Sequence, residues 1–197
     1  TGTFVATSEI ARSTRHSSRS SSLVASRAPY AYRALAVSLM LTFAGGAYAA
    51  PAGGVVAAGS AGIVTNGALT TITQSSANLV LNWQSFGIAP AEAVRFAQPG
   101  SSSVALNRVL GPEPSGIFGS LSANGNVFLV NPNGILFGSR ASINVGGLLA
   151  STLNLSDANF MAGRYSFTHP GSGSIVNQGT INADGGSVAL LGTSVRN

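Results

Sequence analysis

Asn131-Pro132-Asn133-Gly134-Ile135-Leu136-Phe137-Gly138 joins a turn-forming segment to a short apolar run. Asn and Gly tolerate positive φ, proline presets φ to about −65°, and an Asn side chain can bond the backbone two residues on. The runs on either side, residues 127–130 and 135–137, are rich in β-branched and aromatic residues. This stretch therefore predicts a strand, a tight turn and a second strand.

The same alternation of short apolar runs and turn residues extends outward from this stretch. The runs are residues 63–64, 79–81, 94–96, 104–106, 117–118, 127–130, 135–137 and 143–145. Gly, Asn, Ser or Pro separates nearly all of them, which is typical of strands joined by turns. Asn177 and Asn197 lie 20 residues apart, near the coil length of a parallel β-helix.

Composition favours such a solenoid over a layered globular domain. Charged residues make up 8% of the chain, too few to cover the faces of surface helices. In a β-helix, each coil bonds to its neighbours, apolar side chains stack inward, and Asn side chains can stack into ladders. We expect residues 50–62 and 83–116, which are poorly patterned, to supply caps or extra-helical β elements. Only residues 156–162 suggest a short helical turn.

Several ordered blocks carry a family resemblance. They are residues 81–88, 94–96, 106–109, 117–119, 131–135, 137–138, Ala141 and 143–152. Together they resemble the N-terminal secretion (TPS) domain of two-partner-secretion exoproteins of the filamentous haemagglutinin family from Gram-negative bacteria. The resemblance runs from about residue 60 to residue 195 and implies an all-β, right-handed parallel β-helix with an N-terminal cap. An Asn-Pro-Asn-Leu motif found in some members is absent, which indicates the other subtype.

The resemblance also implies a partner and a set of site residues. The partner is an outer-membrane β-barrel transporter whose periplasmic POTRA domains recognise the secretion domain. The transporter recognition or folding motif is Asn131, Pro132, Asn133, Gly134 and Ile135, called here the 131–135 turn. The other family-pattern positions are Asn82, Trp83, Phe86, Asn107, Arg108, Gly146 and Gly147.

A secretory signal peptide is predicted at residues 1–49. Residues 34–44 are apolar, Arg residues precede them, and Ala47-Tyr48-Ala49 supplies small residues at the cleavage positions. A membrane anchor is the alternative, but the apolar run is shorter than the about 20 residues that cross a bilayer. We therefore expect export by the Sec machinery and cleavage after Ala49 or Ala50.

The predicted leader is longer than export requires. Its Arg- and Ser-rich extension and n-region are residues 1–33. Residues 1–12 resemble the end of the extended signal-peptide region found in this family, and residues 17–22 are expected to be disordered. The mature secretion domain is expected from residue 50 to Asn197 and beyond, because domains of this family usually continue for some tens of residues.

Charge is concentrated in the leader. Residues 1–33 carry five Arg against Glu9, a net charge of +4, whereas from residue 50 onward five Arg face four carboxylates, a net charge of +1. Nucleic-acid binding needs a basic patch on the folded part, so we expect no nucleic-acid partner. The chain has no Cys, which suits a protein that crosses an outer-membrane pore unfolded.

Catalytic chemistry is not indicated. The mature carboxylates are scattered singly along the chain, at Glu92, Glu113, Asp157 and Asp184. His169 stands beside Pro170 and Gly171 as an expected loop residue, and Lys is absent. No G-x-S-x-G, H-E-x-x-H or Walker A motif occurs. We expect no enzyme activity, no cofactor and no metal site.

Two interpretations of the site residues stay open. The 131–135 turn is either a structural turn with an Asn ladder position or a surface presented to the transporter. Trp83 and Phe86 are either core residues or docking anchors. Arg95, Arg108 and Arg140 are either solvated and locally paired, or pair with acidic surfaces of the transporter.

The sequence therefore predicts the N-terminal secretion domain of a large adhesin- or haemagglutinin-like exoprotein, secreted or displayed at the cell surface by way of the periplasm. Its β-helix would nucleate folding outside the cell. Contact with a host or neighbouring cell would come from regions downstream of this chain. The alternative is a surface β-helix protein that binds carbohydrate or degrades polysaccharide.

Overall fold

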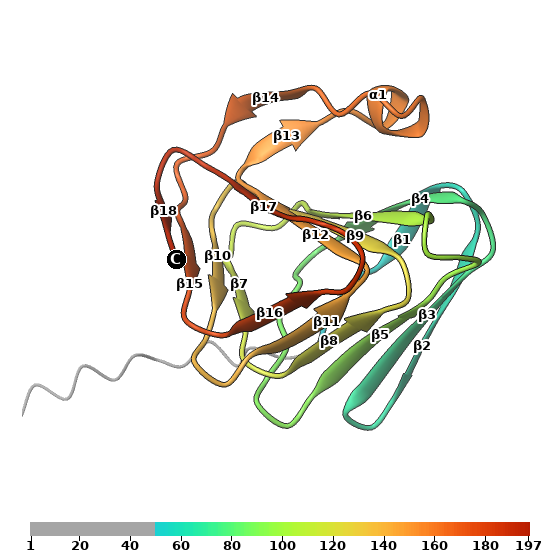
Figure 1. The fold of residues 1–197 in the computed structure, drawn as a ribbon, viewed down its shortest axis with the longest axis horizontal. Coiled ribbons are helices and arrows are strands. Elements are labelled where there is room, and N and C mark those ends of the chain that lie inside the picture. Colours follow the sequence, from blue (N-terminus) through green and yellow to red (C-terminus); the bar gives the residue numbers. More distant parts are fainter. Residues whose placement is uncertain (1–49) are drawn as a thin grey trace, which may run out of the picture. The chain divides into compact units, whose positions relative to one another are not determined.

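From residue 50 onward the chain winds as a β-solenoid of about five turns (Figure 1). The computed structural model describes residues 50–197, so the predicted leader, with Ala47 and Ala49, lies outside the described residues. Each complete turn visits three sheets in succession, and equivalent strands of successive turns lie side by side. The parallel β-helix expected from the sequence is confirmed.

The three sheets run along the solenoid. The first sheet contains β2 (Ala61–Asn66), β3 (Leu69–Gln74), β5 (Ala93–Ala97), β8 (Ser120–Ala123), β11 (Ser142–Val145) and β16 (Thr180–Ala183). The second contains β1 (Val55–Ala58), β4 (Asn78–Trp83), β6 (Val104–Val109), β9 (Asn126–Val130), β12 (Gly147–Ser151) and β17 (Val188–Leu191). The third contains β7 (Ser115–Ile117), β10 (Ile135–Phe137), β15 (Ile175–Asn177) and β18 (Val195–Arg196).

The N-terminal cap is antiparallel, unlike the rest of the three sheets. β1 pairs antiparallel with β4, and β2 pairs antiparallel with β3. The cap predicted from residues 50–62 is thus confirmed. The expectation for residues 83–116 was wrong, because β5 and β6 are parallel strands of the second coil. β6 is almost entirely buried on both faces, so its sequence lacks the alternation that marks a one-sided strand.

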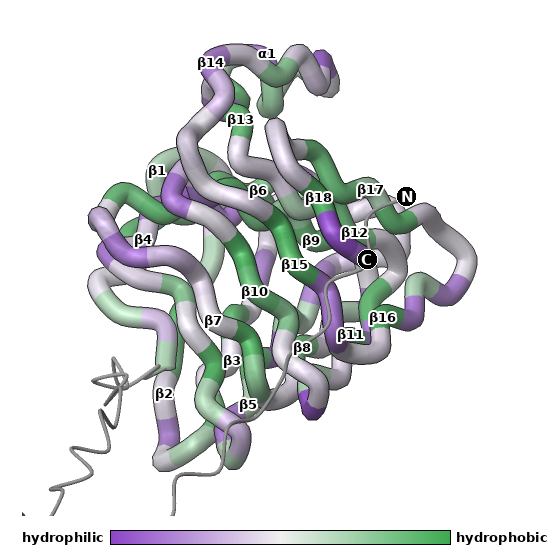
Figure 2. Tube along the Cα trace, turned by 90° about the vertical axis from the view of Figure 1, so that its left-hand side faces the viewer, coloured by the Kyte–Doolittle hydropathy of each residue, from purple (hydrophilic) through white to green (hydrophobic). Residues whose placement is uncertain are grey.

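Inward side chains stack in columns because the coils are in register. Val94, Leu121, Ile143 and Ile181 form one such column in the first sheet. Apolar segments recur at β7, β10 and β15, with polar turns between them (Figure 2). Outside the core, Asn177 Nδ2 donates to Asn197 Oδ1 over 2.8 Å, which confirms a repeat of 20 residues at this position.

One excursion leaves the solenoid between β12 and β15. It comprises β13 (Leu153–Leu155), α1 (Asp157–Met161) and β14 (Phe167–Pro170), and β13 pairs antiparallel with β14. Ser156 caps the helix, its Oγ accepting the Asn159 N–H at 3.3 Å, so the short helical turn expected at residues 156–162 is confirmed. In the described residues 50–197, no helix is long and apolar enough to span a membrane.

The excursion covers an apolar outer face of the second sheet. A second cluster of buried residues, separate from the solenoid core, lies between this face and the excursion. Its members are Val80, Val104, Leu106, Phe128, Val130, Leu155 and Phe160. The rings of Phe128 and Phe160 meet edge to face, with centroids 5.9 Å apart. The second sheet is therefore apolar on both sides, inward toward the solenoid core and outward toward the excursion.

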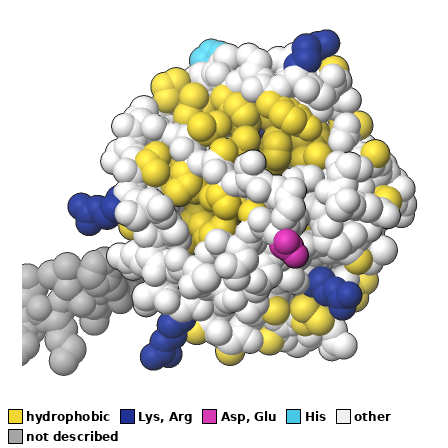
Figure 3. Space-filling view, in the orientation of Figure 1, with side chains coloured by type: hydrophobic (Ala, Val, Ile, Leu, Met, Phe, Trp, Pro, Cys, Tyr) yellow, Lys and Arg dark blue, Asp and Glu magenta, His cyan; other side chains and the backbone are white. Residues whose placement is uncertain are grey.

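The last coil is much less buried than the coils before it. Its strands β16, β17 and β18 are half-buried or exposed, and Val188 and Val195 are 44% and 43% exposed. Figure 3 shows hydrophobic side chains gathered on the end of the solenoid that faces the viewer, with few charges among them. This end presents apolar side chains and unpaired strand edges together.

Candidate recognition site

The 131–135 turn connects β9 to β10. Asn131 Oδ1 accepts the Asn133 N–H at 2.9 Å, and the Asn131 C=O accepts the Gly134 N–H at 3.1 Å. Gly134 has φ of +116°, a value that L side chains rarely adopt. The turn predicted from the sequence is therefore present, and the Asn131 side chain closes it.

This turn also bonds to the preceding coil. Asn131 Nδ2 donates to the Glu113 C=O and to Ser115 Oγ, both at 3.0 Å. Asn133 Nδ2 donates to the Gly111 C=O at 2.9 Å. Asn131 is fully buried, whereas Asn133 is exposed. The buried amide thus holds two consecutive coils together.

The following coil closes over the other side of the turn. The Gly173 N–H donates to the Pro132 C=O, and the Ile135 N–H donates to the Ser174 C=O, each at 3.0 Å. A Cβ at Gly173 would lie 2.2 Å from the Asn133 carbonyl carbon, so only glycine fits there. The turn is enclosed by neighbouring coils on both sides, which favours the structural interpretation of Asn131.

Trp83 and Asn107 form a polar contact inside the core. Asn107 is fully buried in an inward column between Leu81 and Leu129. Its Oδ1 accepts the Trp83 Nε1–H at 3.0 Å, and its Nδ2 donates to the Ala105 and Phe128 carbonyls at 3.3 Å. Phe86 packs edge to face on Trp83, with centroids 5.5 Å apart. Trp83 and Phe86 are therefore core residues.

Arg108 ties the excursion to the solenoid. Its Nη1 lies 2.7 Å from Asp157 Oδ1 and donates to Asn82 Oδ1 at 3.2 Å, while Nη2 donates to the Leu155 C=O. The Arg108 side chain is 14% exposed, so these contacts are partly shielded from solvent. Arg108 is locally paired, whereas Arg95 and Arg140 are exposed.

Replacing Arg108 by alanine should loosen the excursion without unfolding the coils. We expect trypsin to cleave after Arg164, between α1 and β14, about tenfold faster, because that factor corresponds to about 1.4 kcal/mol of lost local stability. Arg140→Ala is the matched control, since Arg140 is exposed. Equal cleavage rates in the two variants would show that Arg108 does not restrain the excursion.

Gly146 and Gly147 stand at the corner between the first and second sheets. The Gly146 N–H donates to the Gly125 C=O at 2.8 Å, and a Cβ at Gly147 would lie 2.3 Å from Asn126 Oδ1. Both glycines therefore allow successive coils to approach closely. The structure places the family-pattern residues at a corner, in the core and under the excursion, and it does not gather them at one surface.

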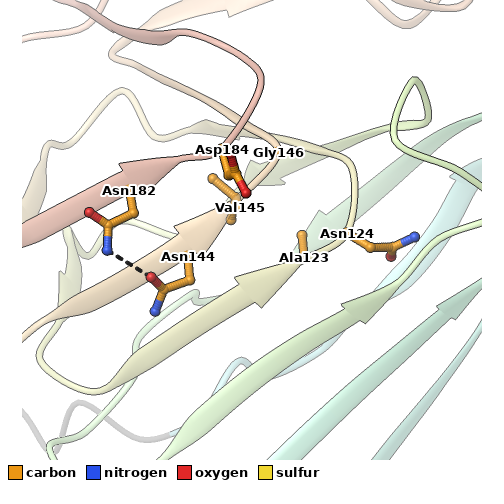
Figure 4. A pocket seen from close by; sticks show the side chains of 7 residues that line it. All are labelled: Ala123, Asn124, Asn144, Val145, Gly146, Asn182 and Asp184. Carbon is orange, nitrogen blue, oxygen red and sulfur yellow. Dashed lines mark hydrogen bonds between the residues drawn. The ribbon is translucent and has the colours of Figure 1, made fainter.

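Outside these positions, a shallow pocket lies on the outer face of the first sheet (Figure 4). Asn124, Asn144, Asn182 and Asp184 line it, and Asn182 Nδ2 donates to Asn144 Oδ1 at 2.9 Å. Asp184 is the one carboxylate in this lining, whereas glycosidases use a pair. Among residues 50–197, no three His, Cys, Asp or Glu side chains are grouped to hold a metal.

Two structural features escaped the sequence prediction. The buried Gln98 side chain donates to Gln74 Oε1 at 3.0 Å and accepts the Gly125 N–H at 2.9 Å. Gln74 and Gln98 are 24 residues apart, close to the length of one coil, and this spacing could have predicted their contact. The Phe128, Phe160 and Tyr165 cluster had no periodic signal, because an excursion interrupts the repeat.

The family model of the TPS secretion domain matches residues 47–197. The chain belongs to this family. The crystal structure of the HMW1 secretion domain from Haemophilus influenzae resembles it with a TM-score of 0.68 and 36% identity, over 74% of this chain and 40% of that chain. The solenoid thus has the fold of a solved TPS secretion domain.

Two curated relatives of this TPS domain are both named heme/hemopexin-binding protein and come from Haemophilus influenzae, one of them from strain Rd. They are 45% identical over 98 residues and 36% identical over 130 residues. The matches cover 50% and 64% of this chain, and the chain spans 11% and 14% of the relatives' length. TPS exoproteins are secreted from Gram-negative bacteria through an outer-membrane partner, so the domain implies such a transporter.

Proposed function

We propose that residues 50–197 act as the N-terminal secretion domain of a large adhesin- or haemagglutinin-like exoprotein. The leader would direct the chain to the Sec machinery and be cleaved near Ala47, Ala49 and Ala50. In the periplasm, the POTRA domains of the outer-membrane transporter would bind the extended or partly folded chain. The relatives' names extend the proposal to heme or hemopexin binding by the complete exoprotein.

The observation that carries this proposal is the match of the TPS secretion-domain model to residues 47–197. The last coil of the described residues is consistent with it. Its apolar side chains and strand edges can template a further coil. Each added coil would bury apolar area worth about 25 cal/mol per Å². Folding outside the cell could therefore draw the chain through the transporter without a nucleotide, in keeping with a sequence that has no nucleotide-binding motif.

Secretion with and without the partner barrel tests this function. We expect the chain, given a start codon and a tag, to reach the medium only when the barrel is present. Asn131→Ala and Asn133→Ala should each block export, because both side chains bond the turn to the preceding coil. Normal export of both variants would contradict the role assigned to the turn.

The alternative is a carbohydrate-binding β-helix protein. The amide-lined pocket of Figure 4 favours it, since amides and a carboxylate can bond sugar hydroxyls. This function predicts that a folded, β-rich chain stays in the periplasm whether or not the barrel is present, and binds oligosaccharides there. Barrel-dependent secretion without sugar affinity would reject it.

A further inference from the structure

The cap strand β2 forms one edge of the first sheet. The strand order is β16-β11-β8-β5-β3-β2, so within residues 50–197 β2 pairs on one side only, with β3 (Figure 1). Its register with β3 is regular over six residues, from Ala61 opposite Gln74 to Asn66 opposite Leu69. β2 therefore offers a straight row of unpaired backbone donors and acceptors.

The backbone groups that face outward can be assigned. The Ser75 N–H donates to the Ser60 C=O at 2.8 Å. Bonded and non-bonded pairs alternate in an antiparallel ladder, so residues 62, 64 and 66 also bond to β3. Ala61, Ile63 and Thr65 consequently turn their N–H and C=O groups toward the free side.

Within the described residues 50–197, this edge lacks the features that normally protect an edge strand. Proteins block edges with charges, Pro, bulges or covering segments. No charged residue occurs from residue 50 to residue 91, and β2 contains no Pro. The neighbouring cap strand β1 is shorter and has a register shift between Val56 and Ala58. In β2 the edge is regular, and Val64 is 65% exposed.

The β2–β3 hairpin is a local unit, because its two strands are joined by a two-residue loop. Gly67, with φ of +55°, occupies the first position of its two-residue loop, as a type II′ turn requires. A two-stranded hairpin alone is only marginally stable in water, and a third strand stabilises it. In the folded solenoid β5 occupies the other edge of β3, so the β2 edge stays available throughout folding.

We propose that the free edge of β2 is the docking site at which the outer-membrane transporter adds a β-strand to this domain. The inference rests on the proposed function and names the segment that the transporter binds. Strand addition derives affinity from main-chain hydrogen bonds and needs no charge complementarity, which fits a cap with no charged side chain. The partner could stay bound to β2 while later coils stack on the opposite side of β3.

Proline substitution tests the edge directly. Ala61→Pro and Thr65→Pro each remove an outward N–H while sparing the backbone bonds to β3, and edge strands tolerate such proline. Ala61→Pro is the cleaner of the two, because Thr65→Pro also removes the hydrogen bond of 3.1 Å between the Thr65 and Thr70 hydroxyls. We expect each to weaken binding of the mature chain, purified from the periplasm of cells without the barrel, to the purified transporter by about tenfold, the effect of one hydrogen bond and a steric block. Val64→Thr is the matched control, because it leaves the backbone unchanged, and should bind like the parent chain.

Cross-linking keeps the proposal testable if the proline variants fail to fold. The chain has no native Cys, so Val64→Cys can carry a single photo-reactive label beside the β2 edge. Val188→Cys, which is 44% exposed in the last coil, is the control. We expect the label at position 64 to cross-link to the transporter and the label at position 188 not to.

The outcomes separate this inference from the proposed function. No binding of the unmodified chain to the transporter would overturn both. Normal binding by folded proline variants, or cross-linking at position 188 but not at position 64, would overturn only the docking site. Cross-links at position 64 between two copies of the chain, with none to the transporter, would assign the edge to self-association instead.

Discussion

Replacing Asn131 by alanine should lower the free energy of unfolding by about 3 kcal/mol, because one buried hydroxyl and two part-buried backbone groups lose their partner at once. The groups left without it are the Glu113 carbonyl, Ser115 Oγ and the Asn133 N–H. The unfolding midpoint in urea, followed by circular dichroism, measures this loss. Such a loss is a large share of the stability of a small domain.

For stability, Asn133→Ala is the matched comparison at the same turn. It removes one hydrogen bond, to the Gly111 carbonyl, from an exposed side chain, so we expect a loss of about 1 kcal/mol. Measuring export beside stability separates the two interpretations of the turn. An Asn131→Ala chain that unfolds at the parent midpoint but is not exported would mean that the turn contacts the transporter.

Replacing Asn107 by leucine should lower the free energy of unfolding by about 2 kcal/mol, because the Trp83 indole N–H would be buried without an acceptor. Leucine has the same number of side-chain heavy atoms and the same branching as asparagine, and it matches Leu81 and Leu129, its neighbours in the same column. The loss should therefore come from the missing hydrogen bond and not from a cavity. Urea unfolding measures it.

The double variant Asn107→Leu/Trp83→Phe tests this cause. Removing both polar partners of a buried hydrogen bond costs less than removing one of them. We expect the double variant to be more stable than the sum of the single changes predicts, by about 1 kcal/mol. Strict additivity would show that the Trp83–Asn107 contact, 3.0 Å long, contributes little.

Much of the solenoid could be predicted from local sequence. The turn at residues 131–134 follows from the conformational preferences of Asn, Pro and Gly, and the structure has it. The strands around it follow from short β-branched runs, and the separation of Asn177 and Asn197 matched an observed coil. These predictions succeeded because turn chemistry and strand propensity act over a few residues.

The excursion and its restraint could not be predicted in the same way. Arg108 meets Asp157 across 49 positions of sequence, and no local pattern links them. β6 was expected outside the coils because it is buried on both faces, so its sequence lacks the alternation of a one-sided strand. Its outer face is apolar because Leu155 and Phe160 cover it. Both residues lie far along the chain from β6.

The sequence by itself determined where strands and turns lie, the coil length near its end, and a cap without charges. The tertiary structure alone decided which side chains meet. It placed Asn131 in a buried position between coils, Asn107 inside an apolar column and Arg108 under the excursion. Backbone preference acts between neighbours in sequence, whereas burial depends on which coil or excursion covers a face, and that is set only when the coils stack.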